Sequence, residues 1–322
     1  MKKRIIPVLA AGIAVAVTGC SSSGSSGTGT GASNKSSGAS NVAVGTVGNI
    51  AAGVAADPAA VALLPASAKA NGTISVAMDL QYPPTSFLST SNQPEGFNVD
   101  ISRLIAAKLG LKLQIDNVAF DTIVPGLTGG RYDFTATDMS ATAARLQVLD
   151  MINYWSDGSS LATRSGNPEN LSINNSTICG KTIAVMTGTT QQETYLPILS
   201  KQCTTEGKPA VKQVVLPDVN GALTQLASGR VDGIFYDTPS LAYAVQQHGA
   251  AFELAGAQYA KPAALGNDLV AIGLAKNSPL TKAVQSAMQS IMDSPLYLKA
   301  LSDWGMGAGA IKTASIATAA AG

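Results

Sequence analysis

The sequence predicts an α/β protein with two lobes, each a mostly parallel sheet flanked by helices. From about Asp57 onward, apolar runs alternate with Gly, Pro and Asn over roughly 260 residues, which is more than one ordinary core accommodates. Strand-like runs alternate with helix-like runs, as in parallel sheets joined by crossover helices. Because this alternation occurs in two successive series, we expect two sheets.

The first series begins with a strand in which Ile74 and Val76 alternate with small residues, and Pro83 and Pro84 block its continuation. Apolar residues at helical spacing then predict a helix that ends at Gly110. The expected elements are a strand at 73–78, a helix at 99–109, a strand at 112–118, a helix at 122–128 and a strand at 132–137.

The second series opens with a strand at 181–186 and continues through Gln225 and Val231 to Tyr236. Ligands of such sheets bind outside the carboxyl ends of the strands, where the connecting loops converge. We therefore look for functional residues in the loops that follow the predicted strands.

The N-terminus has the pattern of a bacterial signal peptide: a basic segment at 2–4, an apolar run at 5–17 and small residues before Cys20. The run is too short to span a bilayer comfortably. The segment before Cys20 resembles a lipobox, which implies that residues 1–20 are the processed leader and that lipidated Cys20 anchors the protein outside the cytoplasm. The alternative is a conventional cleavage site that a cysteine happens to follow.

Residues 21–56 are rich in Ser, Gly, Ala, Thr and Asn, and they contain no aromatic side chain. This composition buries too little apolar surface to offset the entropy of ordering the backbone. We expect a disordered tether between the anchor and the folded part, or a spacer with no function of its own.

Charge and cysteine content exclude several classes of function. The net charge is +1 and only 13% of the residues are charged, so the chain offers no basic surface for nucleic acid. Cys179 and Cys203 remain as a pair in an oxidising compartment, and a disulfide between them would contribute roughly 3 kcal/mol. The single His248 and the absence of CxxC spacing speak against a metal or catalytic thiol, and we expect no cofactor.

Four segments carry a resemblance to one family. They are Gly96-Phe97-Asn98-Val99-Asp100-Ile101, Ser140-Ala141-Thr142-Ala143-Ala144-Arg145, Gly188-Thr189-Thr190-Gln191, and Ser228-Gly229-Arg230-Val231-Asp232-Gly233-Ile234-Phe235-Tyr236-Asp237. Over about residues 68 to 305 the chain resembles the bacterial extracellular solute-binding proteins of family 3, which deliver polar amino acids to ABC importers. The first segment departs from the family in having Asn98 where the family prefers Asp, and we expect Asn98 to cap the helix.

The resemblance implies a type II periplasmic-binding-protein fold with a ligand between the lobes. Arg145, with Ser140, would hold the α-carboxylate of an amino acid, and the loop at Thr189 and Thr190 would grip it from the second lobe. Asp237 would pair with the α-ammonium group. Without the surrounding pattern, Arg145 would be a solvated surface residue, and the loop an ordinary helix cap.

The remaining candidate ligand residues surround the ligand's side chain. Tyr82 and Phe120 stand where the family sandwiches it, although either ring could belong to the core. Asp79 and Asp138 would favour a cationic or hydrogen-bond-donating ligand. Asp138 is a departure, because many relatives carry a small residue there, and it could instead join the ammonium site or pair within its own lobe. Met186, which ends the strand before the second-lobe loop, completes the expected site.

The resemblance further implies that lobe 1 comprises 57–162 and 266–322, that lobe 2 comprises 163–265, and that the lobes close around the ligand at two hinge crossings. We expect a monomer that binds an amino acid and passes it to the permease subunits of an ABC transporter, and that is not an enzyme. The alternatives are an enzyme on the same fold, similar to cyclohexadienyl dehydratase, and a sensor or adaptor for a membrane receptor.

Overall fold

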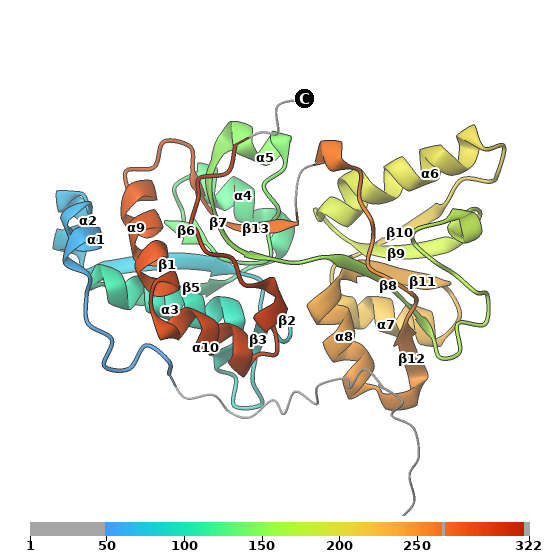
Figure 1. Cartoon of the computed structure of the whole chain (residues 1–322), viewed down its shortest axis with the longest axis horizontal. Helices are drawn as coiled ribbons and strands as arrows, with labels where there is room; N and C mark the ends of the chain where they lie inside the picture. Colours follow the sequence, from blue (N-terminus) through green and yellow to red (C-terminus); the bar gives the residue numbers. More distant parts are fainter. Residues whose placement is uncertain (1–48, 266–267, 319–322) are drawn as a thin grey trace, which may run out of the picture. The chain divides into compact units, whose positions relative to one another are not determined.

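The computed structural model describes residues 49–265 and 268–318 (Figure 1). It confirms the α/β class and the two sheets. Each main sheet has five strands, in the orders β5-β1-β6-β13-β7 and β10-β9-β11-β8-β12. We call the elements around the first sheet the first lobe and those around the second sheet the second lobe.

In the first lobe, β5, β1, β6 and β7 run in one direction, and β13 runs against them. The pairs β1–β5 and β1–β6 are parallel, whereas β13 runs antiparallel to β6 and β7. A small three-stranded sheet, β2-β3-β4, follows β1. The elements are α1 (Pro58–Ala62), α2 (Ala66–Asn71), β1 (Thr73–Met78), β2 (Gln81–Tyr82), β3 (Ser86–Leu88), β4 (Pro94–Glu95), α3 (Phe97–Leu109), β5 (Lys112–Asn117), α4 (Phe120–Thr128), β6 (Phe134–Thr135), α5 (Ala143–Val148), β7 (Leu149–Ser156), β13 (Leu269–Ala275), α9 (Thr281–Met292), α10 (Pro295–Asp303) and η5 (Gly307–Gly309).

The second lobe repeats this plan. The strand β9 is parallel to β10 and β11, whereas β8 is antiparallel to β11 and β12. The elements are β8 (Ser159–Arg164), η1 (Ser176–Ile178), β9 (Thr182–Met186), η2 (Gln191–Tyr195), α6 (Leu196–Thr205), β10 (Lys212–Leu216), α7 (Val219–Ala227), β11 (Gly233–Asp237), α8 (Thr238–Gln247), η3 (Gly249–Ala251), β12 (Phe252–Leu254) and η4 (Ala263–Leu265).

Alternating strand residues divide each lobe into two apolar layers. Ile74, Val76 and Met78 of β1 lie in the cluster that includes α3, α9 and α10, whereas Ala77 lies in the cluster formed with α4. In the second lobe, α7 and α8 pack on one face of the sheet, and α6 packs on the other. Helices on both faces leave the strand ends as the place for polar functional groups.

The predicted strand at 132–137 shortens to Phe134–Thr135. The Ser75 N–H donates to the Asp133 carboxylate at 2.7 Å. This side-chain hydrogen bond replaces the bond that a backbone carbonyl would accept in a continued strand pair. The helix predicted at 122–128 begins earlier, at Phe120, whose N–H donates to the Asp79 carboxylate at 3.0 Å.

The boundary between the lobes also moves. Ser159–Arg164 pairs with β11 and β12 of the second sheet, so the first crossing lies at Asp157-Gly158 and not after residue 162. At the other end, part of the expected tether at 21–56 is folded: Ile50, Ala51 and Val54 pack against the first-lobe core. Cys20 and the predicted signal peptide lie outside the described residues.

The Cys179–Cys203 disulfide is confirmed and joins the segment after η1 to α6. Within residues 49–265 and 268–318, no helix has the length and apolar character needed to cross a membrane.

Candidate functional site

The predicted site residues lie where parallel strands end, as the fold requires. Asp79 directly follows β1, and Asp138 lies in the loop after β6. In the second lobe, Thr189 and Thr190 follow β9, and Asp237 is the last residue of β11. Arg145 comes from α5, in the same first-lobe loop region as Asp138.

Arg145 joins the two lobes through its guanidinium group. The Thr142 side chain caps α5 by accepting from the Arg145 N–H at 3.3 Å, which fixes where the side chain starts. Its Nη1 donates to the Ser140 carbonyl at 3.0 Å, and its Nη2 donates to the Gly188 carbonyl of the second lobe at 2.9 Å. The guanidinium lies 5.6 Å from the Phe120 ring centroid, a cation–π contact.

This arginine retains the capacity to bind an anion. It is only 9% exposed, and burial lowers its pKa. Among the residues that the structure describes, no carboxylate forms an ion pair with it. A guanidinium has five N–H donors, and the two carbonyl bonds leave others for a ligand carboxylate. The Ser140 carbonyl, not its hydroxyl, contacts Arg145.

The second-lobe loop is shaped by Gly188, whose φ is +75°. A Cβ at this position would lie 3.2 Å from the Asp121 Cβ. The Thr189 hydroxyl donates to the Met186 carbonyl at 2.7 Å, whereas the Thr190 hydroxyl lies 3.5 Å from Arg145 Nη1. The Met186 side chain is fully buried in the second-lobe core and presents no accessible surface to a ligand in this structure.

Asp237 is held in place by Gln191, a residue that the sequence did not single out for the site. The Gln191 Nε2 donates to Asp237 Oδ1 and to Ser159 Oγ, both at 2.7 Å. Burial, followed by repulsion from Asp138, raises the pKa of Asp237 to about 8. The carboxylate is therefore placed where a cation would be strongly favoured.

Asp138 approaches Asp237 from the first lobe. Its carboxylate accepts from Thr85 Oγ1 at 2.5 Å and from Asn98 Nδ2 at 3.1 Å, and burial raises its pKa to about 6. The expectation that Asn98 caps the helix is wrong: α3 begins at Phe97, and the Asn98 side chain reaches inward to Asp138 and Tyr154. The Asn98 side-chain amide thus donates a hydrogen bond to the Asp138 carboxylate, which an aspartate at position 98 could not do while ionised.

Two predicted ligand residues are covered in this structure. Tyr82 is 3% exposed, its hydroxyl donates to the Pro217 carbonyl at 3.2 Å, and its ring lies 5.5 Å from that of Tyr236. Asp79 is 1% exposed, and its oxygens accept from Gln81 and from the Phe120 N–H. Tyr82 is thus a first-lobe residue packed into the second-lobe core.

Asp157 is the carboxylate that sequence reasoning missed. It lies at the first crossing, where its N–H donates to the Asp268 carbonyl of the second crossing at 2.8 Å. Burial, followed by repulsion from Asp237 and Asp138, raises its pKa well above the usual value. An acidic residue directly before a glycine could have indicated Asp157 as a site residue. The predicted end of lobe 1 at residue 162, however, places Asp157 inside that lobe.

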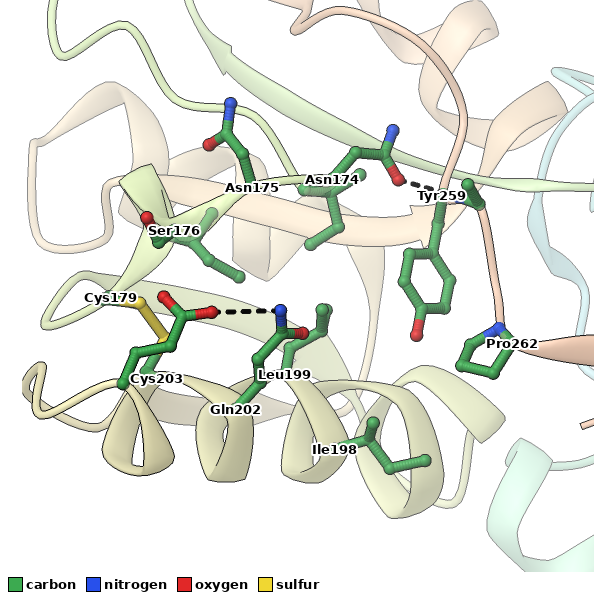
Figure 2. Close-up of a pocket in the computed structure, with 14 residues that line it drawn as sticks. Asn174, Asn175, Ser176, Cys179, Ile198, Leu199, Gln202, Cys203, Tyr259 and Pro262 are labelled. Atoms are coloured by element: carbon green, nitrogen blue, oxygen red, sulfur yellow. Dashed lines mark hydrogen bonds between the residues drawn. A yellow bond between two sulfur atoms is a disulfide. The ribbon is translucent and has the colours of Figure 1, made fainter. Parts of the chain in front are cut away.

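A cavity elsewhere in the second lobe has a different character. It lies beside the disulfide and holds about 150 Å³, and Figure 2 shows Asn174, Ile198 and Tyr259 among its lining residues. Its lining contains one charged residue, Glu206, so it lacks paired groups for a zwitterion. In the described part of the chain, no group of three His, Cys, Asp or Glu side chains is arranged to hold a metal ion.

Comparison with known proteins identifies the relatives of this arrangement. Residues 74–307 match the bacterial extracellular solute-binding proteins, family 3. The arginine-binding protein of Corynebacterium glutamicum is 26% identical over 260 residues, which cover 80% of this chain and 83% of the relative.

Solved structures agree with this assignment. An ancestral arginine-binding protein bound to arginine is 27% identical, with a TM-score of 0.63, over 72% of this chain and 98% of that structure. An ancestral amino-acid-binding protein, described as a precursor of cyclohexadienyl dehydratase, is 23% identical, with a TM-score of 0.61, over 74% of this chain and 97% of its own. At that identity, the second likeness shows the fold alone.

Proposed function

Because the chain belongs to family 3 of the bacterial extracellular solute-binding proteins, we propose that it captures an amino acid with a cationic side chain, of which arginine is the first candidate. Delivery to an ABC importer and membrane anchoring through Cys20 are parts of the same proposal. The observation that carries it is the buried Arg145, which forms no ion pair with a described residue and whose charge acts on Asp237, a buried carboxylate of the other lobe.

The charges of the site match a zwitterion. The α-carboxylate would take the free donors of Arg145, which is already bonded to Gly188 across the lobes. The α-ammonium group would meet Asp237, whose pKa is raised to about 8 by burial and by the nearby charge of Asp138. A simple acid or a simple amine would satisfy only one of these groups.

Asp138 explains why a cation would favour closure. It follows β6 of the first lobe, whereas Asp237 ends β11 of the second, and the charge of Asp138 disfavours the ionised form of Asp237. A cationic group between them would replace repulsion by attraction, so the closed form would be favoured only when occupied. An anionic amino acid such as glutamate would add repulsion.

The relatives' names support the arginine-type ligand. The Corynebacterium protein and the ancestral protein described above are both named for arginine. We also propose that Asp79, Tyr82 and Phe120 contact the ligand's side chain. Asp79 and Tyr82 are covered in the present structure, so this contact would require them to become accessible.

A thermal-shift screen tests the proposed function. The purified protein is heated with each of the twenty amino acids, ornithine and citrulline; a ligand present at about 100 times its Kd stabilises the fold by about 2.7 kcal/mol. Stabilisation by cationic amino acids is the expected result, and no response across the panel contradicts it. Mass spectrometry of the same mixtures tests the enzyme alternative, because a binding protein leaves the ligand unchanged.

The lipid anchor requires its own test. We expect a Cys20→Ala variant to leave the membrane fraction of the expressing cells, whereas the wild-type chain remains there. Equal membrane retention of the two chains contradicts anchoring through Cys20.

A further inference from the structure

Asp157 and Asp237 are brought together by the pairing of β8 with β11. Ser159 is the register partner of Asp237, and Asp157 precedes Ser159 by two residues. Beyond the end of β11, the Thr238 N–H donates to the Gly158 carbonyl at 2.8 Å, and the Thr238 hydroxyl donates to the same oxygen at 2.9 Å. These bonds hold the two aspartates at neighbouring positions.

Asp157 is held in place by hydrogen bonds within the chain. Its backbone N–H is bonded to the second crossing at Asp268, and its Oδ1 accepts from the Gly158 N–H at 2.6 Å. Asp237 is similarly held through one oxygen by Gln191. The Tyr236 hydroxyl is a further hydrogen-bond donor to Asp237, whereas the second oxygen of Asp157 accepts no hydrogen bond from the described residues.

Within residues 49–265 and 268–318, neither aspartate forms an ion pair. The charge of Arg145 acts on Asp237 from a greater distance and partly offsets the effect of burial on its pKa. The other charged groups that act on Asp157 are Asp138 and Asp268, both negative. Their repulsion adds to the burial that raises the pKa of Asp157.

We propose that Asp157 is a further ligand-binding residue, which shares the ligand's α-ammonium group with Asp237. The inference rests on the proposed function and deepens it. An ammonium group has three N–H donors, and one carboxylate oxygen from each aspartate would accept one of them. Since both acceptors belong to the second lobe and its hinge, this part of the site is formed before the lobes close. The pair would select α-amino acids over α-hydroxy acids.

The test compares two ligands that differ only at the α-carbon. L-Arginine and its α-hydroxy analogue, in which a hydroxyl replaces the ammonium group, are titrated calorimetrically into the wild-type protein and the Asp157→Asn variant. We expect the variant to bind arginine about tenfold more weakly while its affinity for the hydroxy analogue is unchanged or improved, since a charge-assisted bond is lost only with arginine. Asp293→Asn, which removes an exposed carboxylate after α9, should leave both affinities unchanged.

The outcomes separate this inference from the proposed function. Wild-type binding of arginine with an unaffected Asp157→Asn variant overturns the role of Asp157 alone, as does an equal loss for both ligands. Failure of the wild-type protein to bind any amino acid overturns both proposals. Thermal unfolding at pH 8 without ligand adds a readout that a structural role would not give: the Asp157→Asn variant should melt at or above the wild-type temperature, because repulsion is removed.

Discussion

The raised pKa of Asp237 predicts that ligand binding is coupled to proton release. Without ligand, this pKa is raised to about 8, because the carboxylate is buried and because Asp138 repels its charge, while the hydrogen bond from Gln191 and the charge of Arg145 act in the opposite direction. A bound ammonium group favours the ionised form, so the bound state has the lower pKa. The proton must leave when the ligand enters, and affinity therefore rises with pH up to about 8.

The size of the effect follows from one linked proton. With a ligand-free pKa of about 8, the ionised fraction falls by a factor on the order of 50 between pH 8 and pH 6, equivalent to about 2.3 kcal/mol. Titration of L-arginine at pH 6, 7 and 8, in buffers with different heats of ionisation, measures the affinity and the protons released. The Asp237→Asn variant should bind more weakly and release fewer protons than the wild-type protein. A wild-type affinity that varies less than twofold over this range would refute the coupling.

Three further predictions concern the residues around the site and the fold. Asn98→Asp should lower the free energy of unfolding by about 2 kcal/mol in urea titrations, because the new carboxylate would lie against that of Asp138. Adding Asp138→Ser should restore most of this stability. An Asn98→Asp variant as stable as wild type contradicts the contact between residues 98 and 138. Reducing the Cys179–Cys203 bond should cost about 3 kcal/mol, and the double Ser variant should match the reduced protein. In the ligand-free protein, raising the pH from 5 to 8 should lower the melting temperature, because the folded state holds carboxyl protons that the unfolded chain has lost; a rising melting temperature would argue against it.

Much of the fold could be predicted because its signals are local. The alternation of Ile74 and Val76 marked β1, and Gly110, with its left-handed conformation, ended α3 as expected. Cys179 and Cys203, the pair left after Cys20 in an oxidising compartment, indicated a disulfide that the structure contains. The strand and the helix end depend on a few neighbouring residues. The disulfide depends on the oxidation of two cysteines for which the sequence offers no metal site or catalytic partner.

The boundaries of the lobes could not be predicted in the same way. The sequence of Ser159–Arg164 is compatible with a strand in either lobe. Its pairing with β11 and β12 assigns it to the second lobe. The error had a functional consequence, since it placed Asp157 within a lobe and not at the crossing. Register between distant strands is a tertiary property that local pattern does not contain.

The sequence indicated which residues to consider for the site, but it did not predict which side chains they contact. The motif around Arg145 predicted an arginine that binds the ligand carboxylate, and the structure places its guanidinium group against Gly188 of the second lobe. Tyr82 was expected beside the ligand, but it packs against Tyr236. Asn98 was expected to cap a helix, but it supports Asp138. These contacts depend on which side chains oppose one another across the folded chain.

The most direct test of the account is a titration of L-arginine into the wild-type protein, Arg145→Ala and Arg131→Ala. Arg131 is an exposed arginine beside the Tyr132 ring and serves as the matched control. We expect saturable one-site binding by wild type and by the control, and a loss of affinity of about a hundredfold or more in Arg145→Ala, because the charge-assisted bonds to the α-carboxylate disappear. Arginine binding of wild-type strength in Arg145→Ala would contradict the account.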